Sequence, residues 1–379
     1  MRVHVVDPSA YTPPYDHALC AALARAGADV ELITSRFAYG AAPAPDGYTV
    51  REQFYRRAVG APGSRLRLAT KLLEHVPDML GYRRLAGDAD VVHFQWLAVQ
   101  WLDRSLLPRR PIVLTAHDLL PREPRAGQAR AQRRLYDAVD AVVSHSEYGR
   151  RQLVERLGVD PAKVRVIPHG AFDHLANLAG THLPAELRAA GGPVVLFFGL
   201  LRPYKGLEVL LEAWRELRSV PLAGDRPGAH ERPELWIVGR PRMELEPLRE
   251  LAPPGVRFVS RFVSDAELAA CFRRADAVVL PYLETERFDF SGVLATALAF
   301  GKPAVISDVG GFGEVAATGA ARLVAPGDPA ALRDALAELI ADPAARARLA
   351  RGALAAAAGQ YSWTEAARQT LALYRELTG

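Results

Sequence analysis

Short apolar runs alternate with amphipathic segments along most of the chain. Val3–Val6 and Val30–Thr34 are predicted strands, and between them Ala18–Ala26 has the period of a helix that Gly27 ends. The same alternation recurs beyond residue 194. Strands that alternate with helices predict parallel βαβ units with helices on both sheet faces. The pattern therefore predicts an α/β protein with parallel sheets.

The length of 379 residues favours two domains over one core. Residues 171–193 have little periodicity and are predicted to be the linker. We therefore expect one domain at 1–175 and a second at 176–361. Ser362 and Glu365 predict a capped final helix at about 362–379.

Composition and charge exclude several classes of protein. The net charge of +4 is too small to indicate a nucleic-acid-binding domain. Cys20 and Cys271 lack metal-ligand spacing, so no metal is expected, and they are typical of buried thiols in a reducing compartment. The sequence shows neither a signal-peptide core nor an apolar run near 18 residues, so we expect a cytoplasmic protein.

Residues 54–84 are basic and carry regularly spaced leucines. This segment holds seven cations and only two acids, Glu74 and Asp78. Leu66, Leu73 and Met79 can lie along one helix face. Such a helix is typical of peripheral contact with an anionic membrane, here the inner membrane face. The alternative is a helix that packs its leucines on its own domain and leaves its arginines in solvent.

Three turns in the second half can bind an anion. Strand Val194–Phe198 leads into a turn with Gly199, Arg202 and Lys205, just before a helix predicted from about Lys205. Ser291-Gly292-Val293 opens another helix, and Gly310-Gly311 follows a third strand. Helix N-termini favour anions, and parallel sheets bind ligands at the carboxyl ends of their strands. We expect a phosphate-bearing ligand here; the alternative is ordinary turns with solvated cations.

Polar residues also follow the strands of the first half. His117 ends the strand of LTAHD, and the loop after the first strand contains Tyr15, Asp16 and His17. These residues are candidates for a ligand-binding edge. His117 could instead be a core histidine, and structural roles are expected for His93, His145 and His169.

Several segments together resemble a known family. They are FFGLLRPYKGLEVLLEA, SGVLATALAFGKPAVISDVGGFGEV, IPHG, LTAHD and the terminal YSWTEAA. The chain resembles the retaining nucleotide-sugar glycosyltransferases of family 4 over essentially its whole length. The resemblance implies the GT-B fold, in which two Rossmann-like domains face each other across a cleft, with the final helix packing back on the first domain. It also implies that no metal or cofactor is required.

The resemblance implies a role for each candidate position. The second domain would bind the donor and the first the acceptor, with His117 beside the donor sugar. His117, Lys205 and Arg202 would be catalytic, the latter two on the diphosphate. Donor binding would involve Gly199, Arg202, Lys205, Ser291, Gly292 and Val293, and acceptor binding Tyr15, Asp16 and His17.

The chain departs from the family in one pattern. Many members have two glutamates eight positions apart before the GKP run, where this chain has Phe288 and Thr296. We expect Glu286 or Asp289 to replace a donor contact.

The expected function is transfer of a hexosyl group, with retention, from a nucleotide-diphosphate sugar to a hydroxyl. A UDP-sugar is favoured as donor, and the acceptor would be a glycan, glycolipid or small molecule. The alternatives are a non-catalytic nucleotide-sugar-binding protein, or an epimerase or phosphorylase of the same fold.

Overall fold

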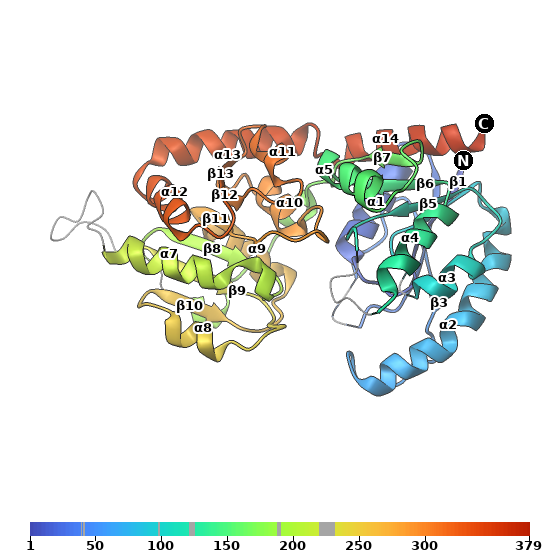
Figure 1. The fold of residues 1–379 in the computed structure, drawn as a ribbon, viewed down its shortest axis with the longest axis horizontal. Coiled ribbons are helices and arrows are strands. Elements are labelled where there is room, and N and C mark those ends of the chain that lie inside the picture. The colour runs from blue at the N-terminus through green and yellow to red at the C-terminus, as the bar shows by residue number, and fades with distance from the viewer. Residues whose placement is uncertain (39, 41, 98, 121–125, 188–190, 220–231) are drawn as a thin grey trace. The chain divides into compact units, whose positions relative to one another are not determined.

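The computed structural model describes residues 1–379 except 39, 41, 98, 121–125, 188–190 and 220–231. The chain divides into two compact units (Figure 1). Unit 1 comprises Met1–Gly170, Glu286–Phe290 and Ser362–Gly379, and unit 2 comprises Ala171–Thr285 and Ser291–Tyr361. The boundary therefore differs from the expected one at 175. A second difference is that 286–290, assigned from the sequence to the second domain, belongs to unit 1.

Unit 1 is built on a seven-stranded sheet of order β3-β2-β1-β4-β5-β6-β7, with parallel pairing throughout the described strands. The strands are β1 Arg2–Asp7, β2 Asp29–Ser35, β3 Thr49–Phe54, β4 Val91–Phe94, β5 Ile112–Thr115, β6 Ala141–Ser144 and β7 Val164–Val166. The helices are α1 Pro13–Arg25, α2 Arg65–Leu85, α3 Gln100–Leu106, α4 Gln128–Ala138, α5 Glu147–Arg151 and α14 Trp363–Thr378, with short turns η1 Ala86–Asp88 and η2 Gln152–Arg156.

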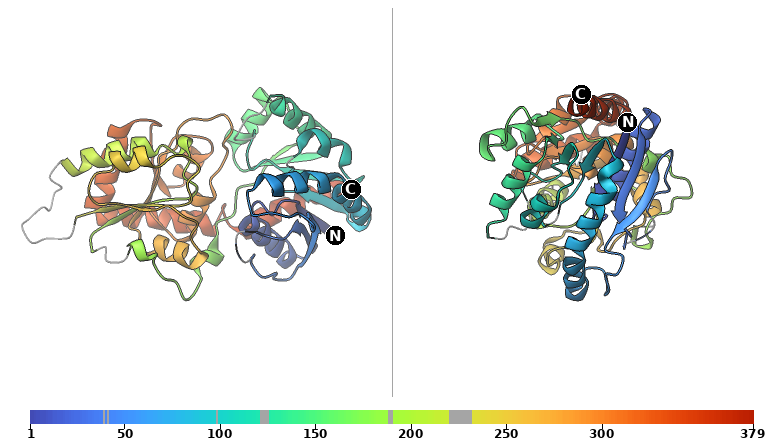
Figure 2. Two further views of the ribbon diagram at one scale, coloured as in Figure 1. Left: turned by 90° about the horizontal axis from the view of Figure 1, so that it is seen from below. Right: turned by 90° about the vertical axis from the view of Figure 1, so that its right-hand side faces the viewer.

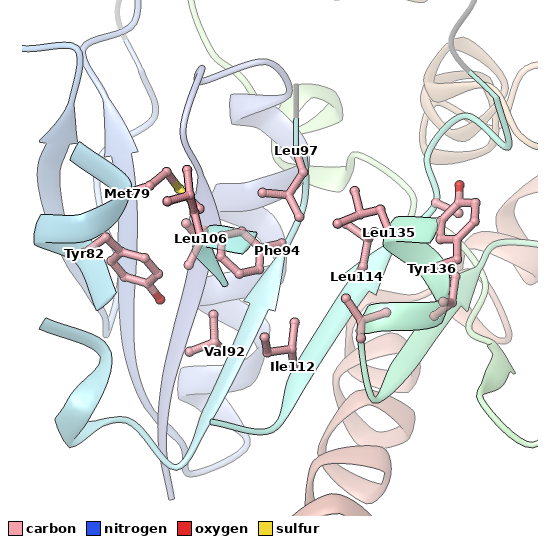
Figure 3. Packing of buried hydrophobic residues seen from close by; sticks show 14 of the residues in the cluster. Met79, Tyr82, Val92, Phe94, Leu97, Leu106, Ile112, Leu114, Leu135 and Tyr136 are labelled. Atoms are coloured by element: carbon pink, nitrogen blue, oxygen red, sulfur yellow. The ribbon is translucent and has the colours of Figure 1, made fainter. Parts of the chain in front are cut away.

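Helices cover both faces of this sheet. One core lies between the sheet and α2, α3 and α4, where Met79 and Tyr82 of α2 pack toward Phe94 and Leu106 (Figure 3). On the other face, α1 contacts α14. Because α14 is the last element of the chain, unit 1 is completed only by its C-terminal residues.

Unit 2 contains a six-stranded parallel sheet of order β10-β9-β8-β11-β12-β13, also with helices on both sides (Figure 2). The strands are β8 Val194–Phe198, β9 Glu234–Val238, β10 Val256–Val259, β11 Ala277–Leu280, β12 Ala304–Ser307 and β13 Ala321–Val324. The helices are α6 Asp173–Ala176, α7 Leu207–Ser219, α8 Glu246–Leu251, α9 Asp265–Arg274, α10 Gly292–Ala299, α11 Phe312–Ala316, α12 Pro329–Ala341 and α13 Pro343–Ala358, with short turns η3 Ala185–Leu187 and η4 Pro203–Lys205.

Two helix starts differ from those predicted by periodicity. Helix α1 begins at Pro13, not Ala18, so Tyr15, Asp16 and His17 lie in its first turns and not in a loop. Proline without its N–H is tolerated at the first helical position, and Pro13 was therefore an available signal. Helix α7 begins at Leu207, because η4 and the left-handed Gly206 (φ 68°) come between the strand and the helix.

The described helices include none with both the length and the hydropathy needed to cross a bilayer.

Candidate functional site

Lys205 is buried at the carboxyl end of β8 and faces a tyrosine. Its side chain is 5% exposed, and its Nζ donates to the Tyr282 hydroxyl at 2.8 Å. The same Nζ lies 4.7 Å from the centroid of the Tyr282 ring. Tyr282 follows β11, the strand next to β8. A buried lysine at the carboxyl end of a parallel strand is suited to binding an anion there.

The N-terminus of α10 joins this cation through Tyr282. The Tyr282 hydroxyl lies 3.2 Å from Ser291 Oγ, and Ser291 Oγ also accepts from the backbone N–H of Val293 at 3.2 Å. Ser291 is thus the N-cap of α10. Tyr282 therefore links Lys205 to the N-terminus of α10, and both the cation and the positive end of the helix dipole lie at the same edge of the sheet.

Glycines permit this close approach. A Cβ built on Gly199 would lie 3.0 Å from Val293 Cγ2 and 3.1 Å from Lys205 Nζ, and Gly199 has a φ of 112°. A Cβ on Gly206 would collide with the carbonyl oxygen of Pro281. Side chains at either position would push apart the turns that hold Lys205 and α10.

Arg202 and the third predicted turn complete the unit 2 edge. Arg202 is half-buried, and its Nε is buried without a hydrogen-bond partner among the described residues. A guanidinium with an unused buried donor fits an anionic ligand.

Gly310 and Gly311 precede α11, whose Phe312 packs on Tyr282 with ring centroids 5.4 Å apart. The three turns predicted from the sequence thus meet around Tyr282.

His117 lies after β5 in unit 1 among aromatic rings. It stacks on Trp96 with centroids 5.0 Å apart and meets Tyr15 edge-on at 4.5 Å. Its Nδ1 lies 3.3 Å from His145 Nε2, and its Nε2 lies 3.1 Å from Gln95 Oε1. His117 is half-buried, whereas His145 is 3% exposed. The structure thus brings together two residues predicted for different roles, His117 and Tyr15.

The other histidines of this edge are buried and neutral. Burial lowers the pKa of His145 to about 4 and those of His93 and His169 to about 3. The His169 ring stacks on Phe290, and His93 is hydrogen-bonded to Tyr374 and Thr115. His93 therefore has the structural environment expected of it.

Asp16 and His17 lie next to a cavity of about 150 Å³. Burial, and then the adjacent Asp7 charge, raise the pKa of Asp16 well above its usual range. The His17 ring is bonded to the Tyr48 hydroxyl at 2.5 Å. The lining residues are Ala10, Pro13, Asp16, His17, Leu32, Thr34, Ser35, Phe37, Ala42, Pro43, Pro45, Val50 and Glu52.

Glu286 and Asp289 belong to unit 1, unlike Arg202 and Lys205. Asp289 is fully buried, and its carboxylate accepts from Ser144 Oγ, the His145 N–H and Ser146 Oγ. The exposed Glu286 pairs with Arg156. A donor contact by the Asp289 carboxylate would compete with three existing bonds.

Three further residues make contacts at these two sheet edges. Tyr282 links Lys205 to α10, and Gln95 contacts His117. Trp363 packs edge-on against Tyr15 at 5.1 Å. Gln95 and Tyr282 had a local signal, because each lies just beyond the carboxyl end of a buried strand, whereas Trp363 lies in the final helix. Within the described part of the chain, no three His, Cys, Asp or Glu side chains are grouped so as to hold a metal ion.

Two family models match the chain. Residues 15–171 match Glycosyltransferase Family 4, and residues 192–342 match Glycosyl transferases group 1. A D-inositol 3-phosphate glycosyltransferase of Corynebacterium efficiens is 31% identical over 82% of this chain and 77% of its own length. Another, from Kineococcus radiotolerans, is 32% identical over 66% of this chain, which spans only 60% of that relative.

Solved structures share the fold. The Anabaena protein Alr3699/HepE in complex with UDP aligns over 100% of both chains with a TM-score of 0.70 and 18% identity. A sucrose-phosphate synthase from Thermosynechococcus elongatus aligns over 100% of this chain and 99% of its own with a TM-score of 0.72 and 21% identity. These similarities confirm the predicted fold class, two Rossmann-like α/β units of the GT-B type.

Proposed function

The chain belongs to the family 4 glycosyltransferases, and from this we propose that it transfers a hexosyl group from a nucleotide-diphosphate sugar to an acceptor hydroxyl with retention of configuration. UDP is the favoured nucleotide, in keeping with the UDP complex of the HepE structure. The proposed reaction uses no metal and takes place in the cytoplasm.

The observation that carries this proposal is the arrangement of Lys205, Tyr282 and the α10 N-terminus. As the bond between the anomeric carbon and the diphosphate breaks, negative charge grows on the leaving oxygen. Positive groups already fixed at that place stabilise the transition state without reorganising. We assign the diphosphate to Arg202, Lys205 and the first turn of α10, with Gly199 leaving room for it.

Retention follows if the acceptor attacks from the face that the diphosphate leaves. The acceptor oxygen bonds to the anomeric carbon, the bond to the diphosphate breaks, and the acceptor proton moves to the leaving phosphate oxygen. This route needs no protein base. His117 would then lie beside the donor sugar as a positioned polar ring.

Measurement of nucleotide release tests the proposal. Purified full-length protein would be offered a panel of nucleotide sugars, first in thermal-shift assays and then with candidate acceptors. A donor at about 100 times its dissociation constant should raise stability by about 2.7 kcal/mol. Release of nucleotide that depends on the acceptor supports transfer. Donor binding without turnover in any pairing would favour the non-catalytic alternative.

The cavity beside Asp16 and His17 suggests an acceptor group that carries no phosphate. Its described lining includes the carboxyl groups of Asp16 and Glu52 and two hydroxyl residues, but neither Lys nor Arg. The relatives are named for D-inositol 3-phosphate, whose phosphate would need cations. We propose that neutral hydroxyls enter this cavity. Turnover with inositol 3-phosphate but not with unphosphorylated polyols would contradict this assignment.

Helix α2 supports a peripheral contact with an anionic membrane. Its apolar residues divide in a way the sequence did not predict: Met79 is buried, whereas the leucines Leu66, Leu68, Leu72, Leu73 and Leu80 are 41–79% exposed. The helix also holds five cations against two acids. Glu74 and Asp78 accept backbone N–H groups of the preceding loop. A second copy would meet this face with the same positive charge, whereas anionic lipid complements it.

Sedimentation with vesicles tests this contact. The protein should co-sediment with anionic vesicles at low salt and detach at high salt. Because each cation near such a surface contributes about 1 kcal/mol, Arg65→Glu with Arg84→Glu should weaken binding tenfold or more. Arg348→Glu with Arg351→Glu, on α13 of unit 2, is the control with the same change in charge. Equal losses in both double variants, or no sedimentation at all, would contradict an α2 contact.

A further inference from the structure

The hydrogen bonds around His145 determine where the proton of His117 lies. His145 Nδ1 is 3.0 Å from the carbonyl oxygen of Ile167. A carbonyl oxygen only accepts, so this nitrogen carries a proton. Because burial lowers the pKa of His145 to about 4, the ring is neutral near pH 7 and its Nε2 has no proton. His145 Nε2 is therefore an acceptor.

The acceptor lies 3.3 Å from His117 Nδ1, which must donate. A neutral His117 then has its lone pair on Nε2, 3.1 Å from Gln95 Oε1. Two acceptors would face each other there unless the Gln95 amide turns or His117 takes up a second proton. The Gln95 Nε2 is buried without a hydrogen-bond partner among the described residues, so a turn of the amide brings an unused donor to the lone pair. In both cases the proton on His117 Nδ1 stays in place.

From this geometry we propose that His145 is a positioning residue, which fixes His117 as the Nδ1–H tautomer and so leaves Nε2, beside Gln95, as its hydrogen-bond-accepting nitrogen. His145 acts only through His117. Its own backbone is held by Asp289, which accepts the His145 N–H at 2.8 Å. The segment 286–290 thereby fixes the ring that orients the candidate sugar-facing residue.

This proposal extends the proposed function, but its main test does not depend on activity. Full-length protein labelled with ¹⁵N-histidine would be examined by NMR near pH 7, with the His117 signals assigned by their loss in His117→Asn. We expect a protonated Nδ1 and an unprotonated Nε2. A wild-type His117 protonated at Nε2, whether alone or together with Nδ1, would overturn the proposal, whatever the enzyme transfers.

Two substitutions at His145 separate positioning from packing. His145→Phe keeps a ring but removes the acceptor, so His117 should shift toward the Nε2–H form, for which Gln95 Oε1 is the acceptor. In His145→Gln the side-chain oxygen can still accept from His117 Nδ1, and the Nδ1–H form should persist. His93→Gln is the control, because that buried ring bonds Tyr374 and Thr115 instead.

Turnover gives an independent reading. We expect His145→Phe to lower kcat about tenfold with the KM for the donor nearly unchanged, and His145→Gln to restore most of it. A His117 tautomer that is the same in His145→Phe and wild type would overturn the proposal. If His145→Phe changes the His117 tautomer but turnover stays normal, His145 still positions His117, and the role proposed for His117 in transfer is contradicted. If His145→Phe does not fold, the wild-type spectrum and His145→Gln still decide the tautomer.

Discussion

The carboxyl edges of the two sheets have opposite chemistry. In unit 2, the cations Lys205 and Arg202 follow β8, and the positive dipole end of α10 joins Lys205 through Tyr282. In unit 1, His117 and His145 bond each other, His145 donates to the Ile167 carbonyl oxygen, and the buried histidine rings are neutral near pH 7. The same parallel-sheet architecture thus forms one edge suited to an anion and one suited to uncharged hydroxyls. The difference lies in which side chains follow each strand, since a fold does not determine its chemistry.

The largest expected effect is at Lys205. Lys205→Ala should raise the activation free energy of transfer by roughly 3 kcal/mol, which lowers turnover more than a hundredfold. The reason is that negative charge on the leaving diphosphate grows as its bond to the sugar breaks. Nucleotide affinity should fall less. Arg202→Lys should also be impaired, since lysine cannot hold two phosphate oxygens in a fork.

Steady-state kinetics and nucleotide titration of Lys205→Ala measure both quantities, with Arg351→Ala on α13 as a remote cation control. Near-normal turnover in Lys205→Ala would show that the unit 2 edge does not hold the leaving group.

Acid should destabilise unit 1 before unit 2. The pKa values of His93, His145 and His169 lie below the ordinary 6.5 in the folded state. The unfolded chain therefore binds more protons below pH 6.5. The stability these histidines contribute above that pH is lost as pH falls toward 4, by about 1 kcal/mol per histidine per pH unit.

The raised pKa of Asp16 acts in the opposite direction and offsets part of this loss. Urea unfolding at pH 7.5 and 5.5, with hydrogen exchange to distinguish the units, measures the result. Loss of amide protection in unit 2 first would contradict this prediction.

His117→Ala should have a smaller effect, about tenfold on turnover. The nucleotide is assigned to unit 2, so its affinity should remain nearly unchanged. Assays of turnover, nucleotide binding and thermal unfolding on the same preparation distinguish the alternatives. A variant that is unstable but fully active per folded molecule would identify His117 as a core histidine.

Tyr282→Phe should have the smallest effect. It removes the hydroxyl that accepts from Lys205 but keeps the ring, at a cost of about 1 kcal/mol, or roughly fivefold in turnover. If the hydroxyl acts through Lys205, adding Tyr282→Phe to Lys205→Ala should cause little further loss. Fully additive losses in this double-mutant cycle would mean that the two side chains act separately.

Local patterns predicted much of the fold. The predicted cap of the final helix is present, because the Ser362 side chain accepts the backbone N–H of Glu365. This feature depends on neighbouring residues, which a sequence displays directly. The positions of the turns after β8 and before α10 were predicted for the same reason, and anion binding by these turns stays a prediction.

Contacts between distant segments could not be predicted in this way. The bonds of Asp289 to Ser144, His145 and Ser146 span more than 140 positions, and no periodicity reports them. The exposed leucines of α2 show the same limit. Periodicity identified an apolar stripe, but only packing decides that Met79 is buried and Leu73 is exposed.

The division of unit 1 into three chain segments has a consequence for biosynthesis. When residue 170 has left the ribosome, Ser144 and Ser146 still lack Asp289, and His93 lacks the Tyr374 hydroxyl. At this stage α14 has not been synthesised, so the face of α1 that contacts α14 in the folded protein is exposed to solvent. Unit 1 therefore cannot finish folding during translation of its own first 170 residues, although domains commonly fold in order from the N-terminus. The nascent first 170 residues reach their final structure only after α14 has been synthesised. A fragment ending at Gly170 is therefore expected to be a substrate for chaperones.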